Sequence, residues 1–130
     1  MKRIAPYFTG LLLAIASTIV AAHHSFAIYD FATEIEFEGV VEKLTFRNPH
    51  MAMVLKIKDS SGAEKTINFV EGAPANMLLR MGLKPDMMQV GTHLKAIGSP
   101  RNDDPDAYFL KVVILDDGQT FRSVGKNQDR

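Results

Sequence analysis

Three histidines lie where they could bind a metal ion. His23 and His24 are adjacent near the start of the chain, and His50 ends the motif Asn48-Pro49-His50. If processing makes His23 the first residue, its free α-amine and its Nδ1 can hold one metal ion in a chelate ring. A second imidazole, from His24 or His50, would complete a nearly planar set of three nitrogen ligands, which is the geometry that Cu(II) prefers. The sequence therefore predicts a copper site.

The predicted ligand set has alternatives. Cleavage before Ala22 would place His24 third from a free amine, which is also a square-planar site for Cu(II) or Ni(II). Adjacent histidines on a flexible N-terminus also bind metals nonspecifically. His50 could instead hydrogen-bond a neighbouring carbonyl, since Asn-Pro-X is a turn sequence. All of these interpretations are open at the level of the sequence.

Four other polar residues could contact a ligand. Asn48 belongs to the Asn-Pro-His motif, and Glu71, Asn76 and Arg80 form the polar side of a predicted helical segment. Glu71 and Arg80 could hold an anionic ligand beside a barrel mouth, or form a solvated ion pair. His93 lies at the start of a predicted strand and is interpreted as structural.

Common catalytic motifs are absent from the sequence. It contains no Gly-x-Ser-x-Gly elbow, no His-Glu-x-x-His motif, no phosphate-binding glycine loop and no cysteine. The sequence therefore favours a binding module over an enzyme. A copper oxidoreductase would need the same histidines together with an open coordination position and a surface for substrate.

Residues 1–22 have the pattern of a signal peptide for export. They contain, in order, a charged start, an apolar core and a small-residue cleavage region: Lys2 and Arg3, Phe8–Ile15, and Ser17–Ala22. Cleavage after Ala22 would release a periplasmic protein that begins at His23 and has no stable membrane span. The alternative is an uncleaved anchor, because the apolar stretch of about 19 residues approaches the length that crosses a bilayer.

The chain after the signal peptide is predicted to be one domain, residues 23–122, with a flexible polar tail, residues 123–130. Of the 15 basic residues, Lys2 and Arg3 precede the cut, so 13 remain against 15 acidic residues. A near-neutral exported chain argues against nucleic acid as a partner. The absence of cysteine excludes a disulfide framework, which is ordinary for a bacterial periplasmic domain.

The apolar pattern predicts a mainly β fold. Strand-length runs bounded by turn residues cover residues 35–46, 51–58, 65–70, 93–98 and 107–115. One short helix is predicted within Ala73–Met81, between the third and fourth strands. Three strands, a helix and two strands form the OB-fold order, so we predict a small five-stranded OB-like barrel.

Alternation along the strands predicts which side chains form the core. In the first strand the apolar positions change parity around Gly39 and Val41, which predicts a bulge that bends this strand. In the last strand the alternation sets Lys111 opposite the apolar face. The predicted core residues are Phe37, Val41, Leu44, Phe46, Leu55, Ile57, Phe69, Leu78, Leu110, Val112 and Ile114.

Three motifs occur together in this chain: Ala22-His23-His24-Ser25-Phe26, then Asn48-Pro49-His50, then Pro74, Asn76, Leu78, Arg80 and Gly82 at alternate positions. In this combination the chain resembles a family of small exported bacterial proteins that is catalogued only as a domain of unknown function. The chain departs from that pattern at Leu83, where an aromatic residue is expected, and at Thr92, where aspartate is common. The resemblance implies an exported domain and implies no activity.

Two functions from different classes are consistent with the sequence. The first is an exported periplasmic binding module that holds copper through the N-terminal histidines. The alternative is a metal-free OB-like domain that binds a protein or an envelope ligand.

Overall fold

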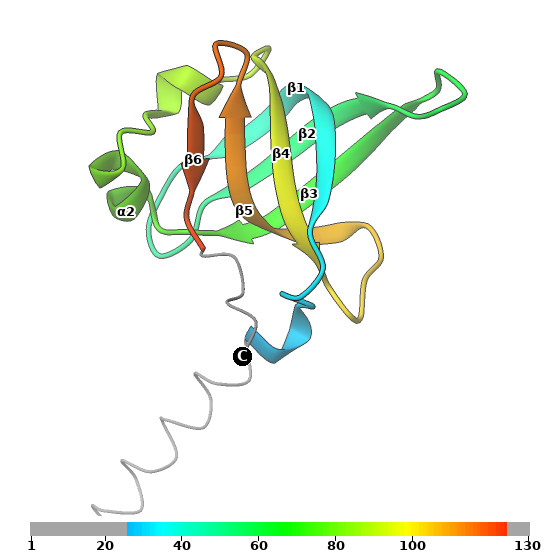
Figure 1. Cartoon of the computed structure of the whole chain (residues 1–130), viewed down its shortest axis with the longest axis horizontal. Coiled ribbons are helices and arrows are strands. Elements are labelled where there is room, and N and C mark those ends of the chain that lie inside the picture. The colour runs from blue at the N-terminus through cyan, green and yellow to red at the C-terminus, as the bar shows by residue number, and fades with distance from the viewer. Residues whose placement is uncertain (1–25, 125–130) are drawn as a thin grey trace, which may run out of the picture.

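A computed structural model of the chain describes residues 26–124 and contains a closed β-barrel (Figure 1). The strands are β1 (Ile35–Thr45), β2 (Ala52–Lys58), β3 (Glu64–Gly72), β4 (His93–Pro100), β5 (Ala107–Leu115) and β6 (Thr120–Arg122). The helices are the 3-10 helices η1 (Phe26–Ile28) and η2 (Pro85–Met88) and the α-helix α2 (Ala75–Arg80).

The strand pairing is that of an OB-fold. The first half of β1 pairs with β4 and its second half pairs with β2, so this bent strand belongs to both sides of the barrel. Antiparallel pairs β2–β3 and β4–β5 extend the sheet, and a parallel pair between β3 and β5 closes it. Helix α2 lies between β3 and β4 in the chain, and the short β6 adds to β5. The predicted five-stranded barrel with one helix is confirmed.

The bend in β1 depends on a bulge and on a glycine. The register with β2 shifts between Val41 and Lys43, so the predicted bulge exists and includes Glu42. A Cβ on Gly39 would collide with the carbonyl oxygen of Lys56. Glycine is therefore required at this point of β1, beside Lys56 of β2.

The barrel interior contains much of the predicted core. Val41, Leu55, Phe69, Leu78 and Leu110 are buried in one hydrophobic cluster. Four further predicted residues are only partly buried and pack against this cluster: Phe37, Leu44, Phe46 and Ile57. The alternation in β1, β2 and β3 therefore identified the correct faces.

Val112 is buried as predicted, but the alternation predicted for the second half of β5 was wrong. The β4–β5 register passes from Ile97 opposite Val112 to Gly98 opposite Leu110, so Lys111 is the extra residue of a bulge. Beyond this bulge Val113 joins the core cluster, whereas Val112 is buried outside it and Ile114 is only partly buried. The side chain of Lys111 is 1% exposed.

An N-terminal segment, residues 26–34, covers part of β5, and we call it the strap. The rings of Tyr29 and Phe31 pack edge-on against Phe109, with centroids 5.4 and 5.2 Å away. Tyr29 also forms a β-bridge with Arg101, and the Asn102 N–H donates to the Ile28 carbonyl at 2.7 Å. These contacts attach the strap, which is blue to cyan in Figure 1, to β5 and to the segment that leads from β4 into β5.

The strap also carries the carboxylate that neutralises Lys111. The Nζ atom of Lys111 lies 2.7 Å from Glu34 Oε1 and donates a hydrogen bond to the Phe31 carbonyl at 3.2 Å. Arg122 from β6 donates to the same carboxylate at 2.9 Å. Hydrogen bonds from Arg122 and Lys111 lower the pKa of Glu34 from 4.5 to about 2. A buried ammonium is tolerated only with such a partner, so this ion pair constrains where the strap lies.

The contribution of Glu34 to stability should depend on pH. Because its pKa is lower in the folded chain, its stabilising effect is complete above pH 4.5 and is lost as the pH falls toward 2. Glu34→Gln should lower the free energy of unfolding by about 2–4 kcal/mol at pH 7, since it leaves the Lys111 ammonium without a charged partner. The difference in the free energy of unfolding between the unmodified protein and Glu34→Gln should be smaller at pH 3 than at pH 7, as measured by urea unfolding.

Glu64→Gln is the matched control, because the ion pair between Glu64 and Lys56 is exposed, and such pairs contribute little. A Glu34→Gln difference that is as small as the Glu64→Gln difference at pH 7 would contradict this assignment.

Candidate functional site

The Asn-Pro-His motif forms the corner between β1 and β2, and this corner caps helix α2. The Asn48–Pro49 peptide bond is cis. Asn48 Oδ1 accepts a hydrogen bond from the Asn76 N–H at 3.1 Å, and the Arg47 carbonyl accepts one from the Ala75 N–H at 3.3 Å. The first N–H groups of a helix have no partner within the helix, and Pro74 at the N-cap provides no side-chain bond. Two residues predicted to bind a ligand, Asn48 and Asn76, therefore meet in a structural contact.

His50 lies against the end of β3. Its Nδ1 is 3.3 Å from the Gly72 carbonyl oxygen and 3.4 Å from Glu71 Oε1. The next residue also attaches the corner to the chain at the end of β3, because the Met51 N–H donates to the Ala73 carbonyl at 3.1 Å. His50 therefore lies within hydrogen-bonding distance of a nearby carbonyl, as one of the two interpretations expected, and it also has a carboxylate as a neighbour. The His50 side chain is 47% exposed and stays accessible to a ligand.

Glu71 connects His50 to the strap. It belongs to β3 and does not lie on the polar side of the helix as predicted. The Tyr29 hydroxyl donates to Glu71 Oε2 at 3.0 Å, while Oε1 faces His50. Burial, followed by the hydrogen bond to Glu71, raises the pKa of Tyr29 above its usual value of 10. Tyr29 therefore remains a protonated donor at neutral pH.

The arrangement Tyr29, Glu71 and His50 includes one residue that the sequence interpretation missed. Tyr29 is 42 residues from Glu71 in the chain, and no local pattern indicates that they meet. A carboxylate beside an imidazole nitrogen is a common arrangement around histidines that bind metals. This cluster can orient an imidazole and can supply one or two ligand atoms, but it contains too few donors to enclose a metal ion alone.

The other predicted site residues are not part of this cluster. Arg80 is exposed, and its side chain makes no hydrogen bond or ion pair with the residues from 26 to 124. His93 Nδ1 lies 2.7 Å from Asp116 Oδ1 and its Nε2 lies 3.5 Å from Glu38, in agreement with a structural role. His23 and His24 lie outside the described residues. Across residues 26–124, no three His, Asp or Glu side chains are grouped so that they could hold a metal ion.

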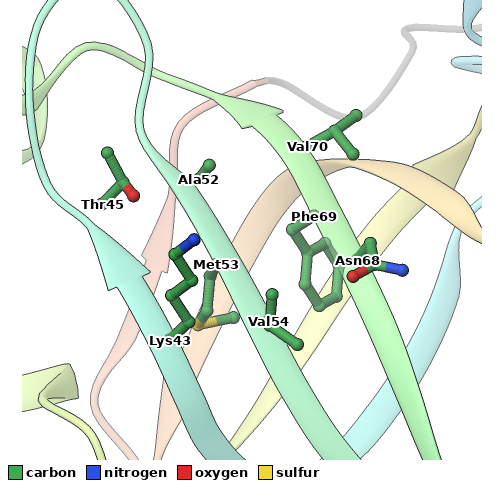
Figure 2. A pocket seen from close by; sticks show the side chains of 8 residues that line it. All are labelled: Lys43, Thr45, Ala52, Met53, Val54, Asn68, Phe69 and Val70. Atoms are coloured by element: carbon green, nitrogen blue, oxygen red, sulfur yellow. The ribbon is translucent and has the colours of Figure 1, made fainter.

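A separate hollow of about 300 Å³ lies on the sheet formed by β1, β2 and β3. Figure 2 shows the side chains that line it from the three adjacent strands: Lys43, Thr45, Ala52, Met53, Val54, Asn68, Phe69 and Val70. Its wall is mainly apolar, with a few polar groups. The β2–β3 face is where OB-folds commonly bind extended ligands.

Comparison with known proteins identifies one family. A profile described as "Family of unknown function (DUF6152)" matches residues 11–107. No curated protein and no solved structure matches the chain. In the part of the chain that the structure describes, no helix is both long enough and apolar enough to span a membrane.

Asn48→Ala should destabilise the protein by about 0.5–2 kcal/mol, because the Asn76 N–H loses its acceptor at the start of α2. Urea unfolding at pH 7 measures this loss. Asn68→Ala is a matched control, since the Asn68 side chain makes no hydrogen bond among the described residues. An equal loss in the two variants would show that Asn48 does not act as a cap.

Proposed function

Since the chain belongs to the DUF6152 family, whose function is unknown, its activity has to be inferred from its own residues, and we propose that it is an exported copper-binding module. The copper ligands in this proposal are the α-amine and imidazole of His23, with a further imidazole from His24 or His50. The signal-peptide pattern of residues 1–22 supports export, which would place the protein in the periplasm.

The observation that carries this proposal is the hydrogen bond between Tyr29 and Glu71. The strap begins at Phe26, two residues after His24, and the 3-10 helix η1 leads from Phe26 directly to Tyr29. The hydroxyl of Tyr29 is 3.0 Å from Glu71, and Glu71 is 3.4 Å from His50. This contact supports the proposal because it holds the strap, which follows His23 and His24 in the chain, against the carboxylate that faces His50.

The chemistry of these groups suits Cu(II). Nitrogen ligands in a plane satisfy its preferred geometry, and an amine with the imidazole of the same residue provides two of them. His50 is half exposed and could provide a third. The Glu71 carboxylate lies beside His50 and can balance the charge of the ion.

A metal-free interaction domain is the second candidate, and the hollow on β1, β2 and β3 favours it (Figure 2). Its residues do not include the His50 corner, so a protein or envelope ligand could bind there whether or not a metal is present.

The test compares two N-termini. Protein recovered from the periplasm, with its first residue established by intact mass, should begin at His23 and bind one Cu(II). An otherwise identical protein with Gly-Ser before His23 should bind at least about tenfold more weakly, a loss of about 1.4 kcal/mol, because the chelating amine is gone. Competition titration with a chromophoric chelator measures both affinities.

His50→Ala should also weaken Cu(II) binding, while His93→Ala is the matched control, because His93 is held between Asp116 and Glu38 away from the corner. If the native and extended N-termini bind copper equally, the amine is not a ligand and the metal-free interaction domain becomes the better interpretation.

A further inference from the structure

The surroundings of His50 determine which of its ring nitrogens carries hydrogen. A neutral imidazole has one N–H and one nitrogen with a free lone pair. Nδ1 faces the Gly72 carbonyl oxygen at 3.3 Å and Glu71 Oε1 at 3.4 Å. A carbonyl and an ionised carboxylate can only accept hydrogen bonds, so an unprotonated Nδ1 would face two acceptors with no hydrogen between them. The Nδ1–H form is therefore favoured, and the lone pair lies on Nε2.

The position of the Glu71 carboxylate depends on the strap. Glu71 Oε2 accepts the Tyr29 hydroxyl at 3.0 Å, which leaves Oε1 directed at His50. The Tyr29 ring is held in turn by Phe109 and Phe31, at centroid distances of 5.4 and 5.7 Å. Tyr29 is only 6% exposed, so its hydroxyl has little freedom to leave the carboxylate.

We propose that Glu71 and Tyr29 are positioning residues that hold His50 with Nδ1 protonated, so that Nε2 is the atom that binds the metal. This inference rests on the proposed copper site and specifies its geometry. In many metal sites a carboxylate accepts a hydrogen bond from the ring nitrogen that does not bind the metal. This bond fixes the orientation of the imidazole and raises its basicity, and loss of the carboxylate typically lowers metal affinity 10–100-fold. The strap thus connects the segment that follows His23 and His24 to the residues that orient His50.

The first test needs no metal. Long-range ¹H–¹⁵N NMR of the metal-free protein reports which nitrogen of each histidine is protonated. His50 should be in the Nδ1–H form, and Glu71→Gln should populate the Nε2–H form, because a carboxamide can donate to Nδ1. Glu64→Gln makes the same change in charge at the other end of β3 and should leave His50 unchanged.

An Nε2–H form in the unmodified protein would overturn the inference. So would a His50 spectrum that Glu71→Gln and Glu64→Gln alter equally. Because this measurement uses no copper, its result is independent of whether the protein is a copper-binding module.

The second test measures Cu(II) affinity of protein that begins at His23. Glu71→Gln should weaken binding about 10–100-fold. Tyr29→Phe, which keeps the ring packing and removes only the hydroxyl, should weaken binding in the same direction. In the His50→Ala background, Glu71→Gln should have little further effect, whereas a purely structural Glu71 would lower affinity with or without His50.

The outcomes separate the two proposals. If the unmodified protein fails to bind Cu(II), the proposed function fails, and the tautomer measurement still decides whether Glu71 orients His50. If the unmodified protein binds Cu(II), and the Glu71→Gln and Tyr29→Phe variants bind Cu(II) as tightly as it does, the positioning role is wrong and the copper site stands.

Discussion

The buried ammonium of Lys111 is the constraint on which the arrangement of the site depends. A charge with 1% exposure requires a carboxylate, and in this chain Glu34 supplies it from the strap at 2.7 Å. Arg122 in β6 binds the same carboxylate, so Glu34 also connects the segment before β1 to the last strand of the fold. The strap consequently lies along β5, and its aromatic residues cover Phe109.

The position of the strap determines which group contacts Glu71. With Glu34 at one end of the strap and Tyr29 near the other, the Tyr29 hydroxyl meets Glu71 on β3. The parallel β3–β5 pair that closes the barrel places Glu71 opposite Phe109, so barrel closure and strap attachment occur at the same place. The corner between β1 and β2 completes the group by adding His50. Elements from four parts of the chain thus converge beside the segment that leads to His23 and His24.

The sequence predicts the barrel well because strand alternation, turn residues and the helix position are local signals. It places the bulge in β1 within a few residues, since the parity of apolar positions changes there. It fails in β5, because the bulge at Lys111 interrupts a run in which nearly every residue is apolar and alternation carries little information. It also assigns Glu71 to the helix, because Pro74 and Gly82 bound the helical segment but nothing local marks the end of β3. The Tyr29–Glu71 contact spans 42 residues and arises only from the fold.

The central claim is that copper held at the mature N-terminus lies beside the His50 corner. Cu(II) broadens NMR signals of nearby nuclei, so a ¹⁵N-labelled protein that begins at His23 can be observed during substoichiometric addition of Cu(II). The account predicts that the backbone amide signals of Tyr29, His50, Glu71 and Gly72 broaden first, while that of His93 is retained. Broadening limited to the residues that follow His23, or equal broadening at His93, would contradict it.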